Sequence, residues 1–220
     1  MRIVPFEEQI THNYIIDYIR DTLKPSEGHL AELEAYAHKN GVPIVQKEVA
    51  SFLETMCRIQ KPMRVLEIGT AIGYSALLML SNMPEGSSIV SIERDENMAK
   101  LARENIEKAG MSERITVVEA DAEEYLKTLE GSFDLIFMDA AKSHYIYFLP
   151  ECIRLMKSGG VLISDNILYG GMVANRALLI RRKITIVKRL KKYIAALCTA
   201  EELKTSLLSI GDGVSISYKL

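Results

Sequence analysis

The sequence has few cysteines, and they lie far apart. Cys57, Cys152 and Cys198 are the three cysteines among 220 residues, and no two of them form a C-x-x-C pair. An odd, scattered set of cysteines argues against both a disulfide framework and a structural zinc site. We therefore expect buried, reduced thiols.

Long apolar runs and a dominant charge are also absent. No run approaches the roughly 18 apolar residues of a membrane span, and the opening MRIVPFEEQI has acids where a signal peptide needs an apolar core. Hydrophobic residues make up 48%, charged residues 25%, and the formal net charge is -2, values that are typical of a globular protein and not of a disordered or strongly nucleic-acid-like chain. We expect a cytoplasmic protein with no membrane partner.

The first sixty residues carry helical patterns. Ile10, Tyr14 and Tyr18 have the spacing of one helix face, a second helix is expected between residues 25 and 41, and a third between residues 46 and 59. No repeat or linker separates these segments from the rest of the chain. We predict a single domain, 1–220, in which 1–60 forms a helical cap on a core of 61–220.

From residue 63 onward, short apolar runs alternate with stretches of helical composition. The runs are RVLEIG, SIVSIE, RITVVEA, FDLIFMD and GGVLISD. Continuous apolar strands bounded by helices indicate a mostly parallel sheet that is covered on both faces. The segment LLSIGDGVSISYKL has two strand-like runs around a Gly-Asp-Gly turn, which predicts a hairpin at the sheet edge. The predicted fold class is a doubly wound α/β sheet.

The first strand ends in a distinctive turn. Glu67 precedes Gly69 and Gly73, and glycines allow a tight turn and a close approach of backbone N–H groups to a ligand. The pattern is not G-x-G-x-x-G, and an acid before the turn would repel a phosphate and favour an ammonium group. S-adenosylmethionine carries such an ammonium group on its methionine half.

Acidic residues also follow the next two strands. Glu93 ends the second strand, where a carboxylate can accept both hydroxyls of a ribose. Asp121 follows the third strand within reach of an adenine amino group, and Ala122 offers a backbone N–H. Each acid alone also suits a helix N-terminus, which attracts carboxylates. Three acids at successive strand ends favour a shared nucleoside ligand.

Oxygen donors follow the fourth and fifth strands. Asp139 comes directly after one strand, and Asp165 and Asn166 follow the next. The carboxyl ends of neighbouring parallel strands converge, and an oxygen-only set suits Mg²⁺, or else Mn²⁺ or Ca²⁺, better than zinc. Such a cation would lower the pKa of an acceptor hydroxyl and aim it at a sulfonium methyl group.

A lysine lies close to the expected cation. Lys142 is either the base that takes the hydroxyl proton or a surface lysine of a helix. His144 and Tyr145 are weaker candidates for the base, and we expect them to pack the helix or to face solvent.

The chain resembles the cation-dependent O-methyltransferases typified by catechol and caffeoyl-CoA O-methyltransferases. The segments that carry the resemblance are VLEIGTAIGYSAL, SIERDENMAKLA, DLIFMDAAKSHY, GGVLISDNILYGG and IGDGVSI, and it extends over nearly the whole chain. It implies the seven-stranded sheet of class I methyltransferases with an antiparallel C-terminal strand, S-adenosyl-L-methionine as cofactor, a divalent cation, and a homodimer.

The resemblance also implies roles for individual residues. The positions that match cofactor contacts are Val45, Glu67, Gly69, Ser75, Glu93 and Ala122, to which we add Asp121 and Asp139. Asp139, Asp165 and Asn166 match the metal ligands. Lys142 matches the base, so that Lys142 and Asp139 are the expected catalytic residues.

Two departures and one local motif bear on the substrate. Ala141 stands where the caffeoyl-CoA enzymes have a second aspartate, and 169–171 reads Tyr-Gly-Gly in place of their Trp-Asn-Gly, which argues against a phenolic coenzyme A ester. The LYGG motif and the length resemble a bacterial branch that includes tRNA 5-hydroxyuridine methyltransferases. That branch implies tRNA as partner, 5-methoxyuridine as product, and O5 and O4 of the base as the chelating pair.

A basic segment agrees with an RNA substrate. No acid lies between Asn166 and Ala200, whereas this segment contains the bases Arg176, Arg181, Arg182, Lys183, Lys188, Arg189, Lys191 and Lys192. Phosphate contacts need such a patch. Apolar residues share the opposite helical face, and they are Ile180, Ile184, Val187 and Ile194. A solvated helix face is the alternative interpretation.

Three other functions compete with tRNA methylation. An O-methyltransferase of a small catechol-like metabolite would share the cofactor and metal chemistry. A dinucleotide-dependent oxidoreductase would also use a glycine turn and Glu93, but it leaves the oxygen donors after the fourth and fifth strands without a task. A noncatalytic binding module would keep the fold alone, and the retained ligand positions argue against it.

Overall fold

The computed structural model describes residues 10–220, so the signal-peptide expectation for the opening segment falls mostly outside the described residues. Within them, the strands form one seven-stranded sheet in the order β3-β2-β1-β4-β5-β7-β6. The strands are β1 (Arg64–Ile68), β2 (Ser88–Glu93), β3 (Ile115–Glu119), β4 (Phe133–Met138), β5 (Met156–Ser164), β6 (Leu203–Leu208) and β7 (Val214–Lys219). The apolar runs of the sequence therefore form the strands that they predict.

In this sheet β7 runs against the other strands. β1 pairs in parallel with β2 and β4, and β3 and β5 continue the parallel set. β7 pairs antiparallel with both β5 and β6. The predicted hairpin forms, with β6 at the sheet edge and β7 inserted beside β5.

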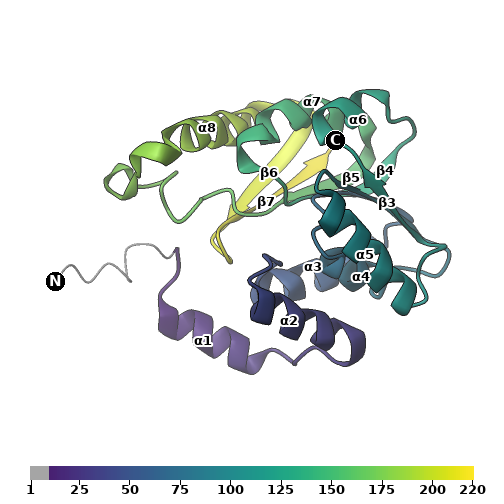
Figure 1. The fold of residues 1–220 in the computed structure, drawn as a ribbon. Helices are drawn as coiled ribbons and strands as arrows, with labels where there is room; N and C mark the ends of the chain where they lie inside the picture. Colours follow the sequence, from purple (N-terminus) through teal and green to yellow (C-terminus); the bar gives the residue numbers. More distant parts are fainter. Residues whose placement is uncertain (1–9) are drawn as a thin grey trace.

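Helices cover both faces of the sheet (Figure 1). The elements are α1 (Asn13–Thr22), α2 (Gly28–Asn40), α3 (Lys47–Gln60), α4 (Tyr74–Leu80), α5 (Glu96–Lys108), α6 (Ala122–Thr128), α7 (Tyr145–Leu155) and α8 (Ile184–Thr199), with the short turns η1 (Lys142–His144), η2 (Arg176–Leu178) and η3 (Arg181–Lys183). One apolar cluster packs α2, α3 and α4 on one face, and a second packs α7 and α8 on the other. This is the doubly wound α/β class predicted from the sequence.

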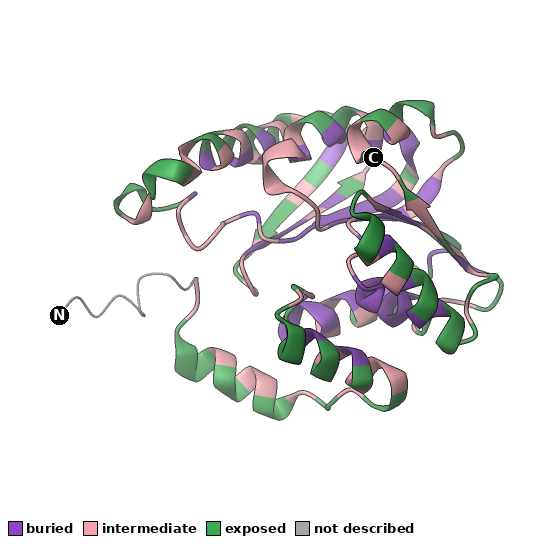
Figure 2. Cartoon of the chain, viewed as in Figure 1, coloured by how far each residue is buried: buried purple, intermediate pink, exposed green. Residues whose placement is uncertain are grey.

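Several local expectations are confirmed and others are wrong. Gly41 ends α2 in a left-handed conformation, as its position after the helix predicts. Tyr14 and Tyr18 share α1 but remain exposed rather than packed, and Figure 2 colours much of this helix as exposed. Ile180 does not belong to the apolar face of α8 but precedes the helix, because η3 intervenes.

Two of the three cysteines are buried. Cys57 and Cys152 are buried, as expected, whereas Cys198 is exposed on the outer side of α8. No helix of residues 10–220 combines the length and the apolar character that crossing a membrane requires.

Candidate functional site

A cavity of about 600 Å³ lies at the carboxyl ends of the first five strands. Its walls come from the residues that follow β1, β2, β3, β4 and β5, and the segment 42–46 closes it on the side of the N-terminal helices. The predicted site residues that line it are Val45, Gly69, Ser75, Glu93, Asp121, Ala122, Asp139, Lys142, Asp165 and Asn166. This volume is in the range of pockets that hold one organic ligand.

The β1–α4 turn requires glycine at position 69. Gly69 has a φ of +103°, and a Cβ atom there would lie 2.2 Å from the carbonyl oxygen of Asp139. The Gly69 N–H donates to Ile92 at 2.9 Å, and the Asp139 N–H donates to Ile68 at 2.9 Å. The ends of β1, β2 and β4 therefore approach so closely that a side chain has no room.

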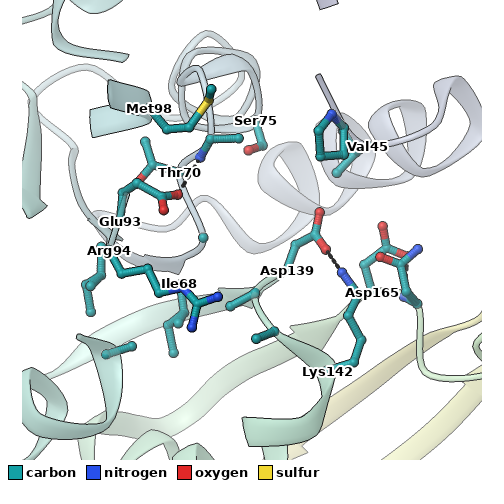
Figure 3. Close-up of a pocket in the computed structure, with 18 of the residues that line it drawn as sticks. Val45, Ile68, Thr70, Ser75, Glu93, Arg94, Met98, Asp139, Lys142 and Asp165 are labelled. Carbon is teal, nitrogen blue, oxygen red and sulfur yellow. Dashed lines mark hydrogen bonds and ion pairs between the residues drawn. The ribbon is translucent and has the colours of Figure 1, made fainter. Parts of the chain in front are cut away.

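Glu93 points into one end of the cavity with its carboxylate held by the backbone (Figure 3). One carboxylate oxygen accepts the N–H of Ala71 at 2.9 Å, and the other accepts the N–H of Asp95 at 2.9 Å. These bonds fix the acid between the glycine turn and α5. Met98, which the sequence did not single out, lines the same end.

Asp121 combines the two roles that the sequence left open. It is the N-cap of α6, where its carboxylate accepts the N–H of Glu123 at 2.8 Å. It also lines the cavity beside Ala122. The acid that caps α6 therefore also lines the cavity, and its contact with an adenine stays a prediction.

Glu67 is the predicted site residue that does not line the cavity. Its side chain is fully buried, and its carboxylate accepts hydrogen bonds from Ser75, at 2.5 Å, and from Ser91. Burial raises the pKa of Glu67 to about 7, while these two hydrogen bonds oppose the shift. Ser75 lines the cavity and lies between it and the acid, so a contact of Glu67 with the cofactor stays a prediction.

Ser91 is a partner that the sequence analysis missed. It stands in β2 among apolar residues, it is fully buried, and its hydroxyl group also lies 2.5 Å from that of Thr70. A serine within the run SIVSIE was the available signal.

The opposite end of the cavity gathers the predicted metal ligands (Figure 3). Asp165 is 1% exposed. Burial and, to a lesser extent, the negative charge of Asp139 together raise the pKa of Asp165 to about 7. Asn166 has a φ of +56°, a left-handed conformation that asparagine tolerates better than most residues.

This donor set fits a hard divalent cation. Two carboxylates and one amide oxygen are ligands that Mg²⁺ and Mn²⁺ accept, and a cation would favour the ionised form of the buried Asp165. In the described residues no group of three or more His, Cys, Asp or Glu side chains is placed to hold a metal. The predicted set has two such side chains, and its third donor would be the amide of Asn166.

The residues of the η1 turn and the start of α7 surround this end. Lys142 lines the cavity, and its Nζ donates to Oδ1 of Asp139 at 2.6 Å, so it is not a free surface lysine. His144 also lines the cavity and contacts Glu123 at 3.1 Å. Tyr145 is fully buried, and its hydroxyl lies 3.2 Å from the carbonyl of Met138 and 3.1 Å from that of Asp165. Tyr145 is thus a packing residue that ties the ends of β4 and β5 together.

Asp212, in the turn between β6 and β7, is a neighbour that the sequence analysis did not assign. Burial raises its pKa, and its own charge raises the pKa of Asp165. The segment IGDGVSI was the signal, but spacing alone does not connect it to the end of β5.

Comparison with known proteins gives one consistent family. The model of the O-methyltransferase family matches residues 23–220. The caffeoyl-CoA O-methyltransferase of Populus kitakamiensis is 28% identical over 200 residues, which cover 86% of this chain and 83% of the relative. The catechol O-methyltransferase of Niastella koreensis is 30% identical over 175 residues, 76% of each chain.

Solved structures of methyltransferases have a similar fold. An SAH-bound methyltransferase of Podospora anserina superposes with a TM-score of 0.87 at 27% identity, covering 100% of this chain and 99% of the other. The O-methyltransferase of Bacillus cereus in complex with SAH has a TM-score of 0.83 at 26% identity, covering 94% and 97%.

Proposed function

The chain belongs to the O-methyltransferase family and is an S-adenosylmethionine-dependent O-methyltransferase of the caffeoyl-CoA and catechol type, and from this premise we propose that it uses a divalent cation to activate the acceptor hydroxyl group. The single observation that carries the proposal is that the acids after β2 and β3 share one cavity with the oxygen donors after β4 and β5. Membership of the O-methyltransferase family excludes the alternative of a dinucleotide-dependent oxidoreductase.

Residues at the Glu93 end of the cavity would hold the nucleoside part of the cofactor. In the proposed pose, Glu93 accepts the ribose hydroxyls, while Asp121 and Ala122 bind the adenine. The methionine half would lie against the glycine turn, near Val45 and Ser75, and Ser75 donates a hydrogen bond to the buried carboxyl group of Glu67. Asp139 and the neighbouring predicted metal ligands would then be near the methyl group to be transferred.

The acceptor arrives at the opposite end, where Asp139, Asp165 and Asn166 would hold the cation. When bound, the cation supplies Lewis-acid activation of a hydroxyl group and fixes its orientation. Lys142, whose Nζ lies 2.6 Å from Oδ1 of Asp139, would be the base that takes the hydroxyl proton. When bound, S-adenosylmethionine would supply the methyl group: the acceptor oxygen would form a bond to the methyl carbon as the carbon–sulfur bond breaks, with S-adenosylhomocysteine as the leaving group.

The metal proposal is tested by Asp165→Ala. We expect this variant to lose Mg²⁺-stimulated methyl transfer to a catechol by at least about 100-fold, because a buried ligand is removed. Its affinity for S-adenosylhomocysteine, measured by calorimetry, should stay close to wild type, since Asp165 lies at the other end of the cavity. Full activity in the variant, or wild-type activity that survives removal of all divalent cations, would contradict the proposal.

For the acceptor we propose 5-hydroxyuridine in tRNA, methylated to 5-methoxyuridine. The support is a basic surface made by η2, η3 and the outer face of α8. Its eight bases are Arg176, Arg181, Arg182, Lys183, Lys188, Arg189, Lys191 and Lys192. Within residues 10–220 none of them forms an ion pair, and Figure 2 draws much of this surface as exposed.

The basic surface is connected to the cavity rim at two points. Lys183 lies over the ring of Tyr169, 5.2 Å from its centroid, in the segment that leads away from Asn166. Arg189 lies over the ring of Tyr147 at 5.2 Å and donates to the carbonyl of Ser143, next to Lys142, at 3.4 Å. Phosphates bound to this surface would place a flanking nucleotide close to the metal ligands.

The acceptor proposal is tested by mass spectrometry of tRNA nucleosides. Purified protein with S-adenosylmethionine and Mg²⁺ should form 5-methoxyuridine on tRNA that contains 5-hydroxyuridine and leave tRNA without it unchanged. The second candidate acceptor is a small catechol-like metabolite, which the similarity to catechol O-methyltransferases favours. Rapid methylation of catechols together with inert tRNA would decide for that candidate.

A further inference from the structure

The turn at 210–213, between β6 and β7, packs between α3 and the segment that follows Asp165 and Asn166. A Cβ atom on Gly211 would lie 2.6 Å from Cγ2 of Val49 in α3, the helix that follows Val45. A Cβ atom on Gly213 would lie 2.5 Å from Cγ of Leu168. The turn thus packs against α3 on one side and against the segment after the metal ligands on the other.

The same turn supplies hydrogen bonds to that segment, residues 166–171. The N–H of Ile167 donates to the carbonyl of Gly213 at 2.9 Å, and the N–H of Leu168 donates to the carbonyl of Asp212 at 3.0 Å. The N–H of Gly170 donates to Oδ1 of Asp212 at 2.6 Å. The side-chain bond differs from the other two because its acceptor carries a charge, which makes such bonds shorter and stronger.

The segment needs this support because its backbone is strained. Asn166 and Tyr169 have φ angles of +56° and +49°, and Gly170 and Gly171 also lie in the left-handed region. A non-glycine residue in this region costs on the order of 1 kcal/mol or more. Bonds from outside the segment therefore help to keep the backbone of Asn166 in this left-handed conformation.

We propose that Asp212 is a positioning residue for the cation, acting through Gly170 on the segment that carries Asn166. The inference rests on the proposed function, in which Asp165 and Asn166 are ligands. Asp212 is not itself a ligand, since Oδ1 binds the Gly170 N–H and the residue is not among those that line the cavity. Removing such a supporting hydrogen bond from a metal site costs about 10- to 100-fold in metal affinity.

The test is to titrate Mn²⁺ into the full chain, saturated with S-adenosylhomocysteine, and to measure the free Mn²⁺ by electron paramagnetic resonance. We expect Asp212→Ala to weaken Mn²⁺ binding about 10- to 100-fold. Asp212→Asn keeps an oxygen acceptor for Gly170 and should stay within about threefold of wild type. The affinity for S-adenosylhomocysteine without metal should be unchanged in both variants.

A matched control lies later in the same loop. Asn175 accepts the N–H of Ala177 at 2.9 Å but does not line the cavity, so Asn175→Ala should bind Mn²⁺ like wild type. If Asp212→Ala fails to fold, Asp212→Ser is measured on the same scale.

Two results overturn the inference alone. The first is Mn²⁺ binding by Asp212→Ala equal to wild type while Asp165→Ala has lost it. The second is an equal loss of Mn²⁺ and S-adenosylhomocysteine binding in Asp212→Ala, which would mark a general structural role. A wild-type protein that binds no Mn²⁺ would instead remove the proposed metal, and the inference with it.

Discussion

Glu67 is an acid that the fold keeps away from water. Its carboxyl group is fully buried between β1, α4 and β2, and burial raises its pKa from 4.5 to about 7. A shift of this size corresponds to about 3 kcal/mol. The unfolded chain ionises first as the pH rises, so the stability that the protonated acid contributes is complete below pH 4.5 and is lost as the pH rises to about 7.

We predict that Glu67→Gln removes this pH dependence. Without cofactor, the free energy of unfolding of the variant relative to wild type should rise by up to about 3 kcal/mol between pH 4.5 and 7.5. Urea unfolding followed by circular dichroism at several pH values measures the difference. Glu104→Gln, on the exposed face of α5, is the control and should show no such trend. A constant difference between Glu67→Gln and wild type would mean that Glu67 is already ionised in the folded protein.

At the scale of elements, α8 has one face that packs on the sheet and another that carries basic residues, and the turn η3 before it carries further basic residues. Val187, Leu190, Tyr193 and Leu197 are buried against the sheet, while the bases lie on the other side of the helix. The turn η3 brings Arg181 and Arg182 into solvent and Lys183 onto Tyr169. At η3 the basic surface therefore contacts the segment that follows Asn166.

We predict that changing Arg181, Arg182 and Lys183 to glutamate raises the KM for tRNA by at least about tenfold, because phosphate contacts are lost and like charges are introduced. The slope of log affinity against log salt should become shallower by about two to three. Catechol methylation should be unaffected.

A variant with the same charge change elsewhere is the control for this prediction. Lys39, Lys100 and Lys108 are exposed lysines of α2 and α5, and changing them to glutamate should leave the KM for tRNA near wild type. Equal effects of the two triple variants would refute a localised RNA surface. Equal effects on tRNA and catechol would indicate misfolding.

The sequence predicted the strands well for a physical reason. Central strands such as β1 and β4 are buried on both faces, so their apolar runs are continuous and easily recognised. The start of α8 was misplaced, since Ile180 continues the apolar spacing of the helix through a turn that is not α-helical. The spacing of apolar residues alone does not show that the α-helix begins only at Ile184, after the η3 turn.

The site was predicted where it depends on strand ends and missed where it depends on register. Asp139 and Asp165 follow their strands directly, and the parallel order of β4 and β5 brings them together. The serine partner of Glu67 on β2 becomes visible only when β1 and β2 are aligned. Asp212 reaches Gly170 only because β7 lies beside β5, a placement that no short motif encodes.

At the scale of the whole molecule, the sheet joins distant parts of the chain into one enzyme. The division into a cap of 1–60 and a core of 61–220 remains a prediction, although residues 42–46 of the cap form part of the cavity wall. The expected homodimer also remains a prediction, which sedimentation velocity would measure.

The insertion of β7 between β5 and β6 has a consequence for biosynthesis. While the protein is made on the ribosome, β5 keeps an open edge until residues 214–219 have emerged from the exit tunnel. Until then, β5, which leads to Asp165 and Asn166, lacks the strand that pairs with this edge. An unpaired edge invites pairing with other chains, so the insertion of β7 also removes an edge that favours aggregation.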